Sequence, residues 1–121
     1  MIEATEQRAE VFDVAQALSS VGGDREFLAE VVGLIQAAWP TLLADIRKGM
    51  AESDLYEVGA KARLAVAAAR YVSARRTYEA AQRLESIAAK GDWEGTREAM
   101  VNLEREVEIL QFFLATLDYL D

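Results

Sequence analysis

Apolar side chains recur every three to four residues along most of the chain, which is the spacing of one face of an α-helix. The first such stretch is short and carries Phe12, Ala15, Leu18 and Val21. The apolar stripe of the second consists of Phe27, Val31, Leu34, Ile35, Ala38, Leu42 and Ile46. The third is built on Val58, Ala62, Ala65, Ala69 and Val72, and the fourth on Tyr78, Ala81, Leu84 and Ile87. The fifth carries Trp93, Met100, Leu103, Val107, Leu110, Leu114 and Leu117, and no stretch alternates as a β-strand does.

Residues that begin and end helices separate these stretches. Glycine accepts the left-handed conformation that closes a helix, and it stands after the first and fourth stretches, at Gly22-Gly23 and Lys90-Gly91. An aspartate caps a helix by accepting its first backbone N–H groups, and three of them stand at predicted starts: Asp24, Asp54 and Asp92. Glu57 follows Asp54 by three residues, as in a capping box. A break is expected near Ser73, and Pro40 should kink the second helix or leave a local break in it.

This pattern predicts an all-α fold. Residues 1–10 are expected to be a loose N-terminal tail and residues 11–121 a single domain, because 121 residues leave no room for two. Long helices joined by short connections pack as antiparallel neighbours. We therefore expect an antiparallel up-down four-helix bundle with a short additional N-terminal helix.

The composition excludes several classes of function. With 21 acidic and 13 basic residues the formal net charge is −8, which argues against a nucleic-acid partner. The sequence contains no histidine and no cysteine, so it has no imidazole for acid–base catalysis, no thiolate and no histidine ligand for zinc. We expect no enzyme activity, no catalytic residue, no metal site and no cofactor.

The distribution of charges bears on the compartment. The first ten residues are polar, and charges interrupt the apolar stretches before they reach the roughly 20 residues of a membrane-spanning helix. We therefore expect a soluble protein without a membrane partner. The absence of cysteine fits the cytoplasm, and the expected oligomeric state is a monomer or a weak homodimer.

Several segments together resemble a histidine-containing phosphotransfer (HPt) domain. The resemblance begins with the run from Val11 to Leu28, which includes Val-Phe-Asp, Ala-Leu-Ser-Ser-Val-Gly-Gly-Asp and Phe-Leu. It continues through Pro40, Leu43 and Ile46, the start at Asp54, Leu84-Glu85 and Gly91-Asp92-Trp93, so it covers about residues 11–117. It implies a four-helix bundle with a short N-terminal helix, in agreement with the periodicity.

This sequence departs from the family motif Ala-His-x-Leu-Lys-Gly-x-Ala at the positions that carry out phosphotransfer. Counting back from Leu84-Glu85 through Ser73-Ala74 aligns the motif with residues 62–69. The phosphoacceptor histidine falls on Arg63, the lysine on Val66 and the glycine on Ala67, and a shift by one residue places the histidine on Ala62. A guanidinium stays protonated and has no lone pair to attack phosphorus. The resemblance therefore implies a degenerate HPt domain without phosphotransfer.

Cations cluster around this position. From Ala60 to Tyr78 there are five of them and no acid: Lys61, Arg63, Arg70, Arg75 and Arg76. Helical spacing places Arg63, Val66, Ala67 and Arg70 on one face, and Arg75 and Arg76 begin the next helix, where the macrodipole disfavours cations. The six expected partner-binding residues are Arg63, Val66, Ala67, Arg70, Arg75 and Arg76. In the HPt family this face meets the acidic pocket of a receiver domain, whereas the alternative is a solvated face paired with neighbouring acids.

Other conspicuous residues have structural interpretations. Trp39 and Trp93 are expected in the core or half-buried. Glu104, Glu106 and Glu108 point to different sides of a helix and are expected to be solvated rather than to bind a metal. The C-terminal apolar residues form either a dimer surface or a packing surface for the N-terminal helix: Phe112, Phe113, Leu114, Leu117, Tyr119 and Leu120.

These observations favour a non-catalytic HPt-like signalling module. It is expected to bind the receiver domain of a response regulator or hybrid kinase and to modulate phosphorelay signalling without accepting phosphate. The alternative is a structural, self-associating helical bundle with no phosphorelay role. A third class, an enzyme with an unfamiliar active site, is disfavoured because no set of catalytic side chains converges.

Overall fold

The computed structural model describes residues 8–116, all of whose regular structure is helical. The helices are α2 (Val14–Ser20), α3 (Arg25–Ala51), α4 (Leu55–Tyr71), α5 (Arg75–Ala89) and α6 (Trp93–Thr116). Residues 8–11 form one further helical turn before α2, so three residues assigned to the tail, 8–10, belong to the helical part.

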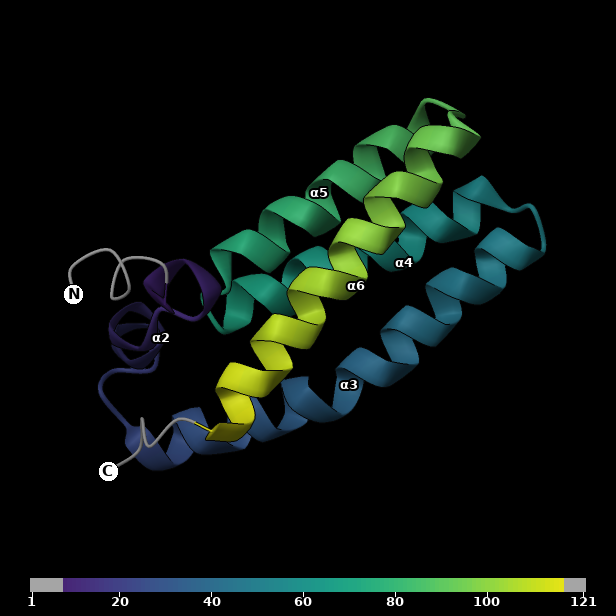
Figure 1. The fold of residues 1–121 in the computed structure, drawn as a ribbon. Coiled ribbons are helices and arrows are strands. Elements are labelled where there is room, and N and C mark those ends of the chain that lie inside the picture. Colours follow the sequence, from purple (N-terminus) through teal and green to yellow (C-terminus); the bar gives the residue numbers. More distant parts are fainter. Residues whose placement is uncertain (1–7, 117–121) are drawn as a thin grey trace.

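The four long helices run up and down as antiparallel neighbours (Figure 1). Helix α4 packs between α3 and α5, while α6 packs against α5 and α3 and closes the bundle. The short α2 lies at one end of the bundle and contacts α3. The predicted all-α class and bundle architecture are confirmed.

Alanine brings α4 and α5 close together. Ala62, Ala65 and Ala69 of α4 are completely buried, as is Ala81 of α5. A Cβ placed on Gly59 of α4 would lie 4.0 Å from the Cβ of Ala88 in α5. The larger core side chains come from all four long helices; fully buried examples are Leu28, Trp39, Ile46, Val58, Leu84, Leu103 and Leu110.

Aspartate carboxylates cap four of the five helices. Asp13, Asp24 and Asp54 each accept a hydrogen bond of 3.0 Å from the backbone N–H three residues on, and Asp92 accepts one of 2.9 Å from Gly95. The three predicted caps are thereby confirmed. Helix α5 differs, because its N-cap residue is Ala74 and no side chain caps it.

The helix ends also follow the predicted breaks. Gly22, Gly23 and Gly91 all have positive φ. Ser73, between α4 and α5, has a φ of 54°, which is unusual for a residue with a side chain.

The face that helix α3 buries differs from the face that the sequence predicted. Phe27 and Leu34 were assigned to the buried stripe, but their side chains are 50% and 72% exposed. The positions that are buried instead are Leu28, Val32, Trp39, Leu43 and Ile46. Both sets have helical spacing, because this helix is apolar around most of its circumference, so periodicity alone did not fix its rotation. The helix also continues through Pro40 without the local break that was one of the two expectations.

The same helix is long and apolar enough to cross a membrane, judged by its length and composition alone. This contrasts with the expectation of interrupted apolar stretches. It is weak evidence for a membrane span, because a core helix of a bundle meets the same criterion, and α3 contributes Leu28, Val32 and Trp39 to the core.

Candidate docking site

The outer face of α4 carries Arg63, Ala67 and Arg70, three of the six side chains that the sequence singled out. Its exposed residues are Tyr56, Ala60, Arg63, Leu64, Ala67, Arg70 and Tyr71. The arginines lie on the side of α5, since Arg63 contacts Glu85 and Arg70 contacts Tyr78. Tyr71 lies on the side of α3. We call this set of seven residues the α4 face.

Arg63 is exposed but already paired. Its Nε donates a hydrogen bond of 2.9 Å to Oε2 of Glu85, and the two side chains are 78% and 29% exposed. This hydrogen bond and the negative charge of Glu85 raise the pKa of Arg63 above its ordinary value. The guanidinium is therefore a permanent cation at the surface.

Arg70 has a neutral partner instead. Its guanidinium lies over the ring of Tyr78, 5.2 Å from the ring centroid, and its Nη2 donates a hydrogen bond of 3.0 Å to the Tyr78 hydroxyl. The same hydroxyl accepts a hydrogen bond of 2.9 Å from Nε2 of Gln82. These contacts hold Arg70 at the surface without neutralising its charge.

Val66 and Ala67 differ in exposure, although the sequence placed both on one face. Ala67 is exposed, whereas Val66 is only 9% exposed. Three residues turn a helix by about 300°, so Val66 lies about 60° from Arg63. Val66 is therefore part of the core, and the exposed aliphatic side chains of the α4 face are Ala60, Leu64 and Ala67.

The two arginines that begin α5 point to different neighbours. Arg75 is exposed and forms an ion pair of 3.6 Å with Glu79 in its own helix. Arg76 turns to α6, where its Nε and Nη2 bind the two carboxylate oxygens of Glu106 at 2.9 and 3.0 Å. Arg76, one of the expected partner-binding residues, thus links α5 to α6.

An apolar groove adjoins the α4 face. It has a volume of about 460 Å³ and is lined by Ser20, Val21, Phe27, Val31, Ala67, Arg70 and Tyr71. Sequence reasoning missed Phe27 and Tyr71 as surface residues. The signal that could have found Phe27 is the surplus of apolar residues in α3, which exceeds what one buried stripe needs.

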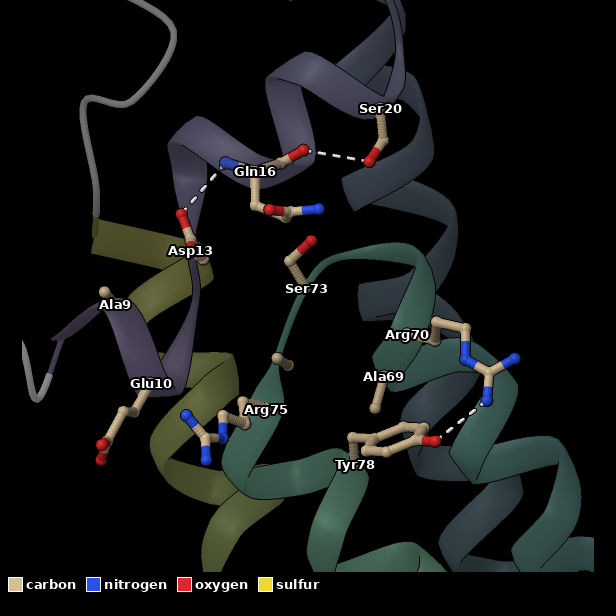
Figure 2. A pocket seen from close by; sticks show the side chains of 11 residues that line it. Ala9, Glu10, Asp13, Gln16, Ser20, Ala69, Arg70, Ser73, Arg75 and Tyr78 are labelled. Atoms are coloured by element: carbon tan, nitrogen blue, oxygen red, sulfur yellow. Dashed lines mark hydrogen bonds between the residues drawn. The ribbon is translucent and has the colours of Figure 1, made fainter.

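A polar cavity of about 440 Å³ lies on the other side of Arg70, between α2 and the connection from α4 to α5 (Figure 2). Its polar lining residues are Glu10, Asp13, Gln16, Ser20, Arg70, Ser73, Arg75 and Tyr78. The backbone N–H of Asp13 donates a hydrogen bond of 3.1 Å to the carbonyl of Ser73, which fastens the two walls. Arg70 and Ser20 line both this cavity and the apolar groove.

Two of the three glutamates singled out in α6, Glu104 and Glu106, have protein partners. Oε2 of Glu104 accepts a hydrogen bond of 2.8 Å from Nε of Arg47, and Glu106 binds Arg76. The side chain of Glu106 is only 13% exposed, so the expectation of a fully solvated row is wrong at that position. Between residues 8 and 116 no group of acidic side chains has the arrangement of a metal site.

The remaining residues singled out by the sequence are aromatic or aliphatic. Trp39 is buried and Trp93 half-buried, as predicted. Phe112 is 65% exposed, Phe113 half-buried and Leu114 buried. Leu117, Tyr119 and Leu120 lie outside the described residues.

Comparisons with known proteins identify a structural relative. No family model matches the sequence, and no curated protein matches it. Among solved structures, the chain is similar to the HPt domain from an Hpt sensor hybrid histidine kinase of Shewanella, with a TM-score of 0.69 and 15% sequence identity. The match covers 90% of this chain and 97% of that domain. The chain therefore has the fold of an HPt domain.

Proposed function

We propose that this protein is a non-catalytic HPt-like signalling module that binds the receiver domain of a response regulator or hybrid kinase. Binding modulates phosphorelay signalling and transfers no phosphate to this chain. The observation that carries the proposal is the α4 face: it exposes Arg63 and Arg70, and Arg70 lines an adjoining apolar groove, on a fold shared with an HPt domain.

The backbone supports the position assigned to Arg63. The resemblance aligns Ser73 with a glycine of the family that stands before the next helix, ten residues after the phosphoacceptor. Ser73 has the positive φ that glycine adopts readily. This agreement supports the alignment that matches Arg63 with the imidazole of the family pattern.

The chemistry of the α4 face suits an acidic partner with an apolar rim. Arg63 and Arg70 are permanent cations that form paired hydrogen bonds with carboxylates. Phe27, Val31 and Tyr71 offer apolar area beside Arg70. A receiver domain keeps its phosphoacceptor aspartate among further carboxylates. The α4 face therefore suits the acidic pocket of an unphosphorylated receiver.

The alternative is self-association through α6. Val101 and Phe112 are 57% and 65% exposed and lie three helical turns apart on nearly the same side. Arg105 and Glu108, both exposed, stand between them. Because charges interrupt this apolar surface, it supports self-association less well than the α4 face supports a receiver.

The test is titration calorimetry against the receiver domains of the same cell, each without phosphate and with beryllofluoride as a phosphate mimic. We expect at least one unphosphorylated receiver to bind, and the substitution Tyr71→Glu to weaken it. Val101→Glu is the matched control, because it adds the same charge at an exposed apolar position on α6. Absence of binding to every receiver, or equal losses in both variants, contradicts the proposal.

A further inference from the structure

We infer that Glu85 selects the partner of Arg63, so that only a surface presenting two or more closely spaced negative charges can bind this arginine. The inference rests on the proposed function, because it specifies the acidic surface that the α4 face accepts. Arg63 in α4 and Glu85 in α5 are 22 residues apart in the chain and in contact in the fold.

The geometry makes Glu85 a competitor for any acidic partner. Glu85 binds the Nε side of the guanidinium at 2.9 Å, and no other described residue forms a hydrogen bond or ion pair with its two terminal NH₂ groups. A single carboxylate from outside either displaces Glu85, which exchanges one ion pair for another, or joins it and meets its repulsion. Neither arrangement contributes much binding free energy, because the site is exposed to solvent.

Two carboxylates change this balance. One can bind the terminal NH₂ groups through two parallel hydrogen bonds while the second takes the Nε–H from Glu85. Arg63 then forms ion pairs with two carboxylates of the partner in exchange for the one that it loses with Glu85. The partner class that passes this selection is a carboxylate cluster, such as the acidic pocket of a receiver domain.

The surroundings of the pair leave room for such a partner. A cavity of about 440 Å³ adjoins it, lined by Leu55, Tyr56, Gly59, Ala60, Arg63, Glu85, Ala88 and Ala89. Four of these residues are glycine or alanine, so an acidic side chain can approach Arg63 along a shallow floor. Tyr56 is 86% exposed and flanks the entrance.

Arg70 shows that the selection is specific to Arg63. Its partner is the neutral hydroxyl and ring of Tyr78, so no acid has to be displaced before Arg70 binds a carboxylate. Arg70 therefore attracts acidic surfaces in general, whereas Arg63 discriminates among them.

The first experiment measures receiver affinity by titration calorimetry for the parent, Glu85→Gln and Glu79→Gln. Glu79 is on the same helix and pairs with Arg75, so Glu79→Gln removes the same charge without releasing Arg63. We expect Glu85→Gln to bind the receiver two- to fivefold more tightly than Glu79→Gln does. The difference should vanish when both substitutions are made in an Arg63→Ala background. Equal affinities of the two variants in the parent background overturn the inference, while the loss caused by Tyr71→Glu would still support the proposed function.

A second experiment needs no receiver. The NMR signal of the Arg63 Nε–H is followed during titration with acetate, which has one carboxylate, and with citrate, which has three, at equal ionic strength. We expect the parent to respond to citrate alone and Glu85→Gln to respond to both. A parent that responds equally to acetate and citrate overturns the inference, whether or not any receiver binds.

Discussion

The side-chain amide of Gln111 in α6 donates a hydrogen bond of 2.9 Å to the backbone carbonyl of Gln36 in α3. In an uninterrupted helix that carbonyl accepts the N–H of the fourth residue on, which here is Pro40 and has no N–H. Gln111 thus supplies the donor that proline lacks. This contact explains how α3 continues through Pro40.

The pairing predicts a coupled effect on stability. Gln111→Leu leaves the Gln36 carbonyl without a donor and should lower the free energy of unfolding by about 1 kcal/mol. In a Pro40→Ala background the restored N–H satisfies the carbonyl, so the same substitution should cost clearly less. Urea unfolding of the four proteins measures the coupling, and an equal cost in both backgrounds argues against this role for Gln111.

Arg75 and Arg76 offer a comparison between neighbouring residues. Arg76→Met leaves the nearly covered carboxylate of Glu106 without its partner and should lower the free energy of unfolding by about 1.5–3 kcal/mol. Arg75→Met removes an exposed pair within one helix and should cost less than about 0.5 kcal/mol. Chemical denaturation of both variants decides the point; similar losses mean that Arg76 does not fasten α5 to α6.

The close contact between α4 and α5 predicts sensitivity to added volume. Ala65 is completely buried, so Ala65→Leu should overpack the interface and lower the free energy of unfolding by about 1–3 kcal/mol. Ala67→Leu makes the same change two residues later on the exposed α4 face and should be close to neutral. Thermal melting of the two variants checks this, and an unchanged midpoint for Ala65→Leu contradicts the packing.

Receiver binding should respond differently to two arginines. Arg63→Ala should raise the dissociation rate and cost about 2 kcal/mol of binding free energy. This value is at the lower end of the range for desolvated charge pairs, because Arg63 is already paired with Glu85 in the free protein. Arg75→Ala lies at the rim and should mainly alter the salt dependence of association. Surface plasmon resonance at several salt concentrations separates these effects. If Arg63→Ala dissociates like the parent, the guanidinium does not enter the partner's pocket.

The absence of histidine predicts the outcome of a phosphotransfer assay. Incubation with a phosphorylated receiver or an active histidine kinase should leave no acid-labile phosphoryl group on this chain. A histidine-containing HPt domain treated in parallel serves as the positive control. Acid-labile label on this chain would contradict the proposed non-catalytic role.

The sequence predicted the helix boundaries well, whereas it did not predict the contacts between residues far apart in the chain. The aspartate caps and glycine ends of the helices depend on neighbouring residues, and the sequence alone located them at Asp24, Asp54 and Gly91. The rotation of a helix about its axis depends on what packs against it. This is why Phe27 was placed in the core and Val66 at the surface.

The candidate site shows the same limit. The cluster of arginines was visible in the sequence, but the partner of each arginine was not. Glu85 and Glu106 lie 22 and 30 residues from the arginines they bind. No periodicity connects such pairs, so only the tertiary structure shows that Arg63 stays on the α4 face whereas Arg76 links α5 to α6.

The uncapped start of α5 has a consequence for the order in which the bundle opens. Without a side chain at Ala74 to accept its first N–H groups, and with two arginines at the positive end of its dipole, α5 gains little from its own N-terminus. Its stability comes from burial against α4 and α6. The first turn of α5 should therefore exchange its amide hydrogens with solvent sooner than the aspartate-capped starts of α3 and α4, and local unfolding of the domain begins at this junction, next to Arg70.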